Sequence, residues 1–300
     1  MTQKIVKISV VGTGAMGTQI AILSASSGYD VAAFDIDEQS YQRTIDNFES
    51  VIKFSEKKPL LSLYEWEKGA EGVSFYKEIA AAVQGADLVI EAAPEDIKLK
   101  RGIFKNLDEL APRHAILATN SSSIPISRIE SATNRPERCV NIHFYSLLMG
   151  VNMADVMGGS KTTAETMETA KGWVRSLGCM PLTVKKETLG FCFNRVWRTI
   201  KREVLHMWAG GYVDFKDIDR AWMISYGTRQ GPFGMMDRIG LDVVYDIEMV
   251  YYNETKDPKD FPPEALKKKI DRKEIGIKTQ KGFYTYPDPE YSTPDFLRNP

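Results

Sequence analysis

Cysteine is scarce in this chain of 300 residues, which holds only three: Cys139, Cys179 and Cys192. They are odd in number, stand far apart and form no CxxC or Cys/His grouping, a pattern that argues against a disulfide framework and a zinc site. We therefore expect reduced thiols in the core of a cytoplasmic protein. No metal site is predicted.

Excess charge of one sign is absent as well, because 39 basic residues stand against 40 acidic ones and leave a formal charge of −1. Such a balance gives no sign of a nucleic-acid partner. No apolar run approaches the roughly 20 residues that span a bilayer, and the opening segment lacks the long apolar stretch of a signal peptide. What is present, 43% hydrophobic and 26% charged residues, is typical of a soluble globular protein with no membrane partner.

Short β-branched runs alternate with amphipathic stretches in the first half of the chain. Five runs have the composition of buried strands: Lys7–Val11, Asp30–Asp35, Leu88–Glu91, Ala115–Thr119 and Cys139–His143. Between the first two lies Ala15–Ser27, with apolar residues at helical spacing. This β-α-β order predicts an α/β fold with a parallel, doubly wound sheet.

The stretch Tyr41–Gly85 is longer than one crossover helix requires. A break at Glu56–Pro59 predicts that this insertion contains a pair of helices projecting from the sheet. We place the end of the first domain near Lys186–Gly190, so that residues 1–187 form the sheet domain and residues 188–300 a second one. The length of the chain suits two such domains.

The second domain shows helical periodicity in place of the strand pattern. Apolar residues recur at intervals of three and four in Leu205–Trp208, Asp217–Ile224 and Met235–Tyr251. Proline residues, among them Pro232, separate these stretches. The second domain is therefore predicted to be all-α.

A glycine-rich turn follows the first expected strand. Gly12, Gly14 and Gly17 have the GxGxxG spacing, and Ala15 and Met16 complete the turn at the start of the expected helix. The first glycine permits the tight turn, the second lets the backbone approach a pyrophosphate, and the third lets the helix pack closely on the strand. The helix N-terminus faces the phosphate charge. Such turns also occur for structural reasons alone, but the strand–turn–helix context predicts a Rossmann-type nucleotide-binding domain.

Asp35 ends the second expected strand, 18 residues after Gly17. A carboxylate there accepts hydrogen bonds from ribose hydroxyls and repels a 2′-phosphate. Ile36 follows where an arginine would have favoured NADP. Arg43 is the nearby alternative, although an exposed helix arginine explains it equally well. The sequence thus predicts NAD as cofactor.

Among the three histidines, only His143 closes a strand of the expected sheet. His114 lies in a polar connection and is predicted to be solvated, while His206 lies in a helix and is predicted to pack with its neighbours. Ligands of open α/β sheets collect beyond the carboxyl ends of the strands. A lone histidine is more often structural, but this position makes His143 a candidate catalytic base.

Asp155 is the candidate partner of His143, twelve residues further on and just after the apolar segment Val151–Met153. Two short strands joined by a turn would bring the two side chains together. A carboxylate on one ring nitrogen fixes the tautomer and makes the other nitrogen a base near neutral pH. The alternative is that Asp155 only caps a turn before Gly158 and Gly159.

The chain resembles the 3-hydroxyacyl-CoA dehydrogenase family over residues 5 to 287. The resemblance is carried, in order, by Val11–Gly17, Ile90–Ala92, Thr119–Ser123, Arg135–Arg138, His143-Phe144, Gly190-Phe191, Asn194-Arg195, Gly231–Phe233, Gly240–Asp242 and Lys281–Tyr284. It implies an NAD-binding domain, an all-helical domain that dimerises, and reversible oxidation of an L-3-hydroxyacyl-CoA to the 3-ketoacyl-CoA.

The resemblance also assigns roles to residues. His143 takes the position of the general base, Asp155 that of its orienting glutamate, and Ser122 and Asn194 those of the residues that hold the reacting end of the substrate. The remaining positions line the cofactor or substrate: Glu95 and Lys100 at the nicotinamide ribose, Asn120 at the cofactor, Lys58 facing the CoA, and Ser146 in the substrate pocket.

Each assignment has a structural alternative. The serines around Ser122 could be a helix N-cap cluster. Asn194 could join a buried helix start, and Glu95 could be a first-turn helix acid. Cys192 lies nearby but has no base placed for it, so a small core residue is the expected role.

The chain departs from the family at three places. Asp155 replaces the usual glutamate and is one methylene shorter, and we predict that its pairing with His143 survives. On the substrate side, Ser146-Leu147 replaces the usual Asn-Pro and Asn152 replaces a lysine. The prediction is therefore a dehydrogenase of a short-chain, 3-hydroxybutyryl-CoA-like substrate. The alternatives are a dehydrogenase of a free 3-hydroxy acid such as carnitine or gulonate, and a catalytically silent NAD-binding protein.

A homodimer is expected from the resemblance and from a helical domain rich in methionine and aromatic residues. These residues, which ordinary core packing explains equally well, are Trp197, Met207, Trp208, Met235 and Met236.

Overall fold

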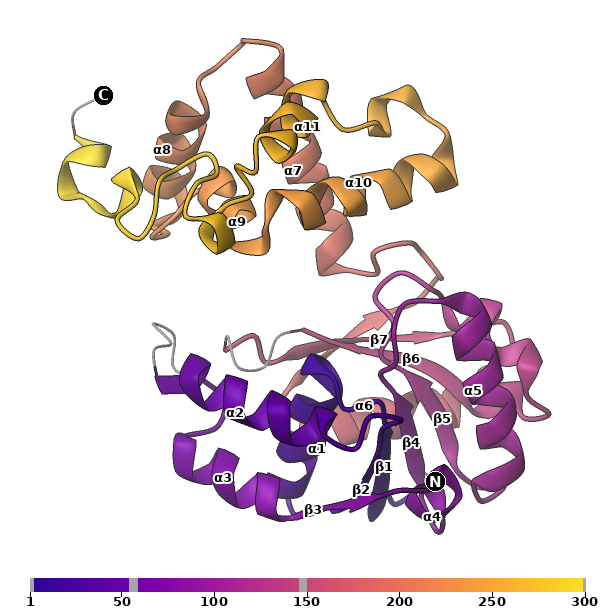
Figure 1. The fold of residues 1–300 in the computed structure, drawn as a ribbon. Coiled ribbons are helices and arrows are strands. Elements are labelled where there is room, and N and C mark those ends of the chain that lie inside the picture. Colours follow the sequence, from indigo (N-terminus) through magenta and orange to yellow (C-terminus); the bar gives the residue numbers. More distant parts are fainter. Residues whose placement is uncertain (1–2, 54–58, 146–149, 299–300) are drawn as a thin grey trace. The chain divides into compact units, whose positions relative to one another are not determined.

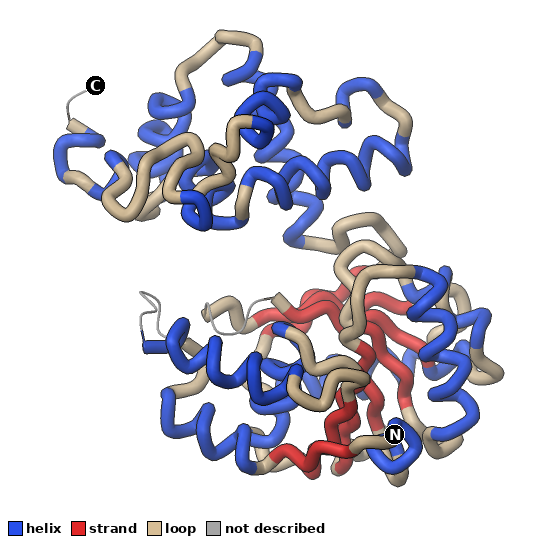
Figure 2. The backbone as a smooth tube through the Cα atoms, viewed as in Figure 1, coloured by secondary structure: helices blue, strands red, loops and turns tan. Residues whose placement is uncertain are grey.

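The computed structural model describes residues 3–53, 59–145 and 150–298, with side chains left undescribed for 48–53. The chain divides into two compact units, Met1–Cys192 and Phe193–Pro300. Figure 1 labels their helices and strands, and Figure 2 shows that the strands of the sheet all belong to the first unit.

Eight strands among the described residues form a single sheet in the order β3-β2-β1-β4-β5-β6-β7-β8. Their bounds are β1 Lys7–Val11, β2 Asp30–Phe34, β3 Val73–Tyr76, β4 Leu88–Glu91, β5 Ile116–Thr119, β6 Cys139–Phe144, β7 Met153–Gly158 and β8 Met180–Val184. Neighbouring strands are parallel except β6 and β7, which pair antiparallel. The doubly wound sheet predicted from the sequence is confirmed, and its order reverses between β1 and β4, where ligands of such sheets bind.

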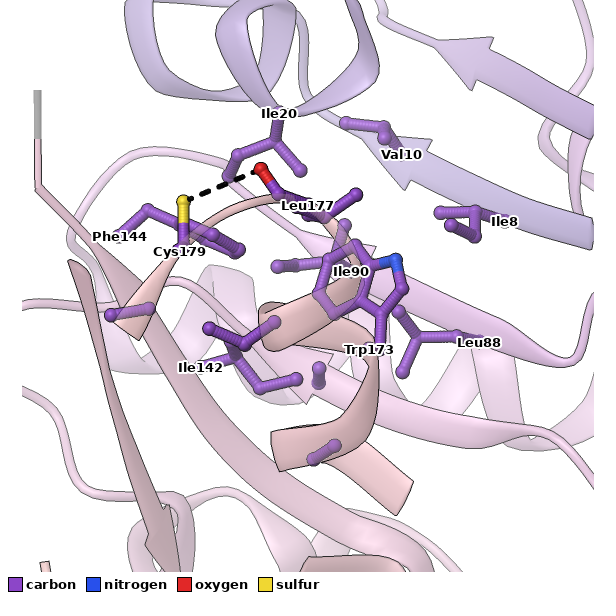
Figure 3. Packing of buried hydrophobic residues seen from close by; sticks show 14 of the residues in the cluster. Ile8, Val10, Ile20, Leu88, Ile90, Ile142, Phe144, Trp173, Leu177 and Cys179 are labelled. Carbon is purple, nitrogen blue, oxygen red and sulfur yellow. Dashed lines mark hydrogen bonds between the residues drawn. The ribbon is translucent and has the colours of Figure 1, made fainter. Parts of the chain in front are cut away.

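Helices cover both faces of the sheet because its central strands are apolar on both sides. In the described part of this unit the α-helices are α1 Ala15–Ser26, α2 Ser40–Lys53, α3 Leu63–Glu71, α4 Ile79–Val83, α5 Ile97–Leu110 and α6 Ala164–Ser176. On one face α1 and α6 pack on the strands, with Ile20 and Trp173 in the same buried cluster as Ile8 and Ile90 (Figure 3). On the other face Phe104 and Leu107 of α5 pack on Val89 and Leu117.

The insertion at residues 41–85 differs from its prediction. It does contain two helices, α2 and α3, but they do not project: Tyr41, Ile45 and Trp66 pack on Ile22 of α1 in one buried cluster. Between α3 and α4 the segment Val73–Tyr76 forms the edge strand β3, which the sequence did not reveal because it is short and only half-buried. The expected break at Glu56–Pro59 falls largely outside the described residues.

The second unit is helical, as predicted. Its helices are α7 Phe193–Ala209, α8 Phe215–Tyr226, α9 Pro232–Ile239, α10 Leu241–Thr255 and α11 Glu264–Asp271. The stretch Met235–Tyr251, expected as one helix, is two, because Gly240 between α9 and α10 has φ +101°, which no helix contains.

Two buried carboxylates organise the second unit. Asp219 accepts hydrogen bonds from the backbone N–H groups of Phe233 and Gly234 and from the Tyr284 hydroxyl. Asp237 accepts from the N–H groups of Phe283 and Tyr284. Burial raises the pKa of Asp219 to about 6 against these stabilising bonds. Asp219 therefore fastens the first turn of α9 to α8, and Asp237 fastens the loop at Phe283 and Tyr284 to α9. Across residues 3–53, 59–145 and 150–298, no helix is long and apolar enough to cross a membrane.

Candidate active site

The glycine turn after β1 is packed against backbone on two sides. Gly12 has φ +99°, and a Cβ there would lie 2.8 Å from the carbonyl carbon of Ala92. A Cβ on Gly17 would lie 1.8 Å from the carbonyl oxygen of Gly12. Both positions are thus restricted to glycine, one by conformation and contact and the other by contact alone.

Gly14 differs from its two neighbours in the motif, since a Cβ there would meet no atom within 4 Å. Gly14 is the N-cap residue of α1, without a side-chain cap, and it is exposed together with Ala15. Met16 is partly buried behind them. The open space above uncapped N–H groups of a helix is what a pyrophosphate requires, so the turn fits a dinucleotide.

Asp35 follows β2 at the same edge of the sheet and contacts the glycine turn. Its Oδ2 accepts hydrogen bonds from the Thr13 backbone N–H at 2.6 Å and from the Thr13 hydroxyl at 3.2 Å. The adjacent Ile36 is 94% exposed. Arg43, the alternative that would have suited NADP, forms an ion pair with Asp37. The hydrogen bond from Arg43 lowers the pKa of Asp37, so Arg43 already pairs with a carboxylate of this chain.

A buried ion pair supports the loop after β4. The Lys100 ammonium lies 2.7 Å from Oε1 of Glu91 and 3.0 Å from the Ala93 carbonyl oxygen. Lys100 is only 1% exposed, and Thr119 of β5 donates to the other oxygen of Glu91 at 2.6 Å. Lys100 thus supports this loop through its contacts with Glu91 and Ala93, and its place at the nicotinamide ribose stays a prediction.

Glu95 joins the β4 loop to the loop after β5. Its Oε1 accepts hydrogen bonds from the Ser121 hydroxyl at 2.6 Å and from the backbone N–H of Ser123 at 2.8 Å, and Lys100 lies 3.4 Å from its Oε2. Partial burial works to raise the pKa of Glu95, but these hydrogen bonds and the Lys100 charge outweigh it and hold the pKa below its usual range. The two loops that flank the expected nicotinamide site are therefore held together by one carboxylate.

The same loop carries Asn120 and Ser122. The Asn120 side-chain oxygen accepts from the backbone N–H of Phe144 at 2.8 Å, which ties β5 to the end of β6. Ser122 is exposed and, within the part of the chain that the structure describes, makes no hydrogen bond to His143. The serine cluster is thus a loop held by Glu95 rather than a helix cap.

His143 and Asp155 lie directly opposite each other in the antiparallel ladder of β6 and β7. His143 Nδ1 is 3.3 Å from Oδ2 of Asp155, which is wholly buried, and His143 itself is 6% exposed. The two strands that bring this pair together are those that the sequence led us to expect. The turn-capping alternative for Asp155 is not what the structure shows.

Two aromatic side chains enclose the His143 ring. The Tyr145 ring packs edge-on at 4.7 Å between centroids, and the Phe191 ring lies at 5.3 Å. The Tyr145 hydroxyl also donates to Oδ2 of Asp155 at 2.6 Å. Neither residue was identified from the sequence as part of the site. Tyr145 was detectable, because it stands two residues after His143 and so on the same face of the sheet.

The remaining predicted residues divide into three groups. Asn194 is half-buried in the first turn of α7, in the second unit. Lys58 and Ser146 lie outside the described residues. Two interpretations of other residues were wrong. Cys192 is exposed rather than in the core, and His206 is exposed, with its Nε2 3.3 Å from the Lys259 carbonyl oxygen. His114 is exposed as predicted and contacts Asp87.

Taken together, a Rossmann-type sheet, a dinucleotide-fitting turn and a histidine–carboxylate pair at one edge define an NAD-dependent oxidoreductase. Residues 7–188 match the NAD binding domain of 3-hydroxyacyl-CoA dehydrogenase, and residues 190–286 match the C-terminal domain of the same enzymes. The chain therefore belongs to the 3-hydroxyacyl-CoA dehydrogenase family. Its cofactor is NAD, and its activity is of the 3-hydroxyacyl-CoA dehydrogenase type.

Individual relatives differ in their substrates. The chain is 33% identical over 284 residues to the 3-hydroxybutyryl-CoA dehydrogenase of Clostridioides difficile, covering 93% of this chain and 99% of that one. It is 32% identical over 283 residues to the 5-formyl-3-hydroxy-2-methylpyridine 4-carboxylate 5-dehydrogenase of Mesorhizobium japonicum, covering 93% and 90%. A solved diketoreductase that acts on dicarbonyl compounds is similar with a TM-score of 0.83 and 32% identity, covering 95% of this chain and 100% of that one.

Proposed function

We propose that the protein catalyses the reversible NAD-linked oxidation of a short-chain L-3-hydroxyacyl-CoA, similar to 3-hydroxybutyryl-CoA, to the 3-ketoacyl-CoA. The observation that carries the proposal is the pairing of His143 Nδ1 with the buried Asp155 carboxylate at 3.3 Å. Removal of hydride from an alcohol carbon requires a base for the hydroxyl proton, and this pair supplies one at the edge where the nucleotide site lies.

The proposed role of His143 follows from its partner. A carboxylate only accepts hydrogen bonds, so Nδ1 carries the hydrogen and Nε2 keeps a free lone pair. In the oxidative direction Nε2 takes the hydroxyl proton while the C3–H bond breaks and the C3–O bond becomes a carbonyl. Bound NAD supplies the hydride acceptor. The Asp155 charge stabilises the imidazolium that results, and Ser122 and Asn194 orient the substrate oxygens.

Cofactor binding is assigned to the glycine turn and to the residues beside it. Gly12, Gly14, Ala15, Met16 and Gly17 would receive the pyrophosphate, with Asp35 on the adenosine ribose. Glu95 and Lys100, whose charged groups lie 3.4 Å apart, would line the nicotinamide ribose, and Asn120 would contact the cofactor. Lys58 and Ser146 keep their proposed roles toward the CoA and the acyl group.

A free 3-hydroxy acid is the second candidate substrate. Two similar proteins act on compounds without CoA, namely a pyridine carboxylate and dicarbonyl compounds. Asn152 stands where the family usually carries a lysine, so a positive charge is missing from the substrate side of the hairpin. This favours a different recognition of the substrate tail while leaving the proton and hydride transfer unchanged.

A substrate panel followed by NADH absorbance tests the proposal. We expect (S)-3-hydroxybutyryl-CoA to give a kcat/KM at least about tenfold above those of free 3-hydroxybutyrate, carnitine and gulonate, because contacts to CoA supply binding energy far from the reacting carbon. A free acid that exceeds the thioester would establish the second candidate. Binding of NADH without turnover of any member would favour a catalytically silent protein.

A homodimer and a cytoplasmic location belong to the same proposal. The chain has a mass of 33.8 kDa, and sedimentation equilibrium at micromolar concentration should give twice this value. A monomer at that concentration would contradict the dimer without affecting the proposed chemistry.

A further inference from the structure

We infer that Tyr145 is a positioning residue of the active site. It holds the carboxylate of Asp155, which is shorter than the usual glutamate, within hydrogen-bond distance of His143. The inference rests on the proposed function, because it assigns Tyr145 to the same histidine–carboxylate pair. The resemblance to the family assigns no role to this residue.

The side chain of Asp155 reaches less far toward His143 than a glutamate would. Directly opposite residues of an antiparallel pair leave a fixed gap between their side chains, and an aspartate spans it with one methylene less than a glutamate. The His143–Asp155 contact is 3.3 Å, which is at the long limit for an N–H···O hydrogen bond. The imidazole alone therefore restrains this carboxylate weakly.

Asp155 accepts a second hydrogen bond, from Tyr145. The Tyr145 hydroxyl donates to Oδ2 at 2.6 Å, the same oxygen that faces His143. Oδ1 has no hydrogen-bond partner among the residues that the structure describes, although the side chain is wholly buried. The hydroxyl of Tyr145 is thus the closest donor to the carboxylate, and a short bond to a charged acceptor is a strong one.

Tyr145 extends the pairing of β6 with β7 just beyond Phe144. It stands two residues beyond His143, so both side chains lie on one face, and its backbone N–H bonds to the Met153 carbonyl at 3.4 Å. Asp155 is then its diagonal neighbour, at a distance that an aromatic side chain can bridge. The ring also packs on the imidazole with centroids 4.7 Å apart. Tyr145 therefore fixes the position of both members of the pair.

Tyr145→Phe is the direct test, because it keeps the ring and removes the hydroxyl. Loss of a hydrogen bond to a buried carboxylate should lower kcat about tenfold and leave KM for NAD within about twofold. Tyr29→Phe is the matched control, since its hydroxyl bonds to Ser176 at 2.5 Å in the same unit and this bond involves neither His143 nor Asp155. An unchanged kcat in Tyr145→Phe, or an equal loss in Tyr29→Phe, would overturn the inference.

A double-mutant cycle separates positioning from general stability. In an Asp155→Asn background, which preserves shape, and in an Asp155→Glu background, which restores the usual length, removal of the Tyr145 hydroxyl should cost less than about twofold in kcat. A purely structural tyrosine would cost the same factor in every background, and that result would refute its positioning role. Thermal unfolding of each variant identifies those that fail to fold.

A measurement without substrate distinguishes failure of the inference from failure of the proposed function. Nitrogen NMR of the His143 imidazole, assigned with His143→Gln, should show the Nδ1-protonated tautomer in the wild type and in Tyr29→Phe. Tyr145→Phe should show a mixture of tautomers. If the tautomer is unchanged in Tyr145→Phe, the inference is wrong whatever the substrate panel shows. If the tautomer responds and no substrate is turned over, only the proposed function is wrong.

Discussion

The turn between β1 and α1 keeps its shape through backbone contacts, whereas the hairpin of β6 and β7 places its functional groups through side chains. At the turn, a Cβ on Gly17 would overlap the Gly12 carbonyl oxygen. At the hairpin, the separation of His143 and Asp155 depends on the length of the acid and on a hydrogen bond from Tyr145. The turn thus has no room for a Cβ at Gly12 or Gly17, whereas the spacing of the pair in the hairpin varies with the length of its side chains.

The largest effect should come from His143→Gln, which removes the base from the hairpin and leaves the turn intact. We expect kcat to fall about a thousandfold, the range that a positioned general base contributes. Steady-state rates measure the loss, and NADH fluorescence titration should give a Kd within about twofold of wild type. An equal weakening of NADH binding would show that the two regions are not separable.

Gly17→Ala should be the next largest, since its Cβ has a backbone oxygen at 1.8 Å and no room to shift. We expect a loss of about 3 kcal/mol in the free energy of unfolding, measured by urea denaturation, as for overpacked cores. Gly14→Ala is the matched control with the same chemical change. It should unfold as the wild type does, because nothing lies within 4 Å, yet bind NADH about tenfold more weakly. Equal stabilities of the two variants would contradict the backbone account of the turn.

Asp35→Asn should have a smaller effect, confined to the cofactor. Loss of the carboxylate removes the acceptor for a ribose hydroxyl and weakens the bonds to Thr13, so NAD affinity should fall about tenfold. At saturating NAD, kcat should stay within about twofold. Asp37→Asn, next to it but paired with Arg43, serves as the control and should leave NAD affinity unchanged. A loss of kcat larger than the loss of affinity would indicate that Asp35 also acts on the hairpin.

The smallest effect should come from the bonds of Glu95, which joins the loops after β4 and β5. The pKa of Glu95 is lowered in the folded protein, so its bonds stabilise the fold above the ordinary carboxyl pKa, and this stabilisation is lost as the pH falls through the folded value. Ser123→Ala removes the bond from the Ser123 hydroxyl and keeps the one from its backbone N–H. Because Glu95 is partly exposed, we expect less than about 1 kcal/mol at pH 7 and a smaller difference at pH 4. Melting curves at both pH values measure it, and a difference that grows toward pH 4 would contradict this sign.

Sequence patterns predicted the parts of this fold that depend on local periodicity and on backbone restriction. The bounds of β1 and β4 agree with the expected strands, and α1 with the expected helix except for its last residue. Edge elements were missed, because β3 is short and half-buried and β8 contains Pro181, so neither has the apolar signature of a central strand. The break at Gly240 was hidden inside a continuous apolar period.

The candidate site was predictable where one residue type at one spacing has one geometric result. Gly12, Gly14, Gly17 and Asp35 are of this kind. The spacing of Tyr145 from His143 places both on one face of the sheet, but its bond to Asp155 is a diagonal contact across two strands, which periodicity along one strand does not reveal. Lys100 was placed on the cofactor by resemblance, whereas its burial beneath Glu95 depends on how α5 packs.

The register of β6 and β7 bears on how such an enzyme diversifies. β6 is fixed by β5 on one side and β7 by β8 on the other, so the pairing of His143 with Asp155 does not depend on the segment that connects them. The segment between the two strands can therefore change in sequence without moving this pair. Exchange of residues 146–152 for those of a relative should change the preference for the substrate tail and leave the pairing of His143 with Asp155 intact.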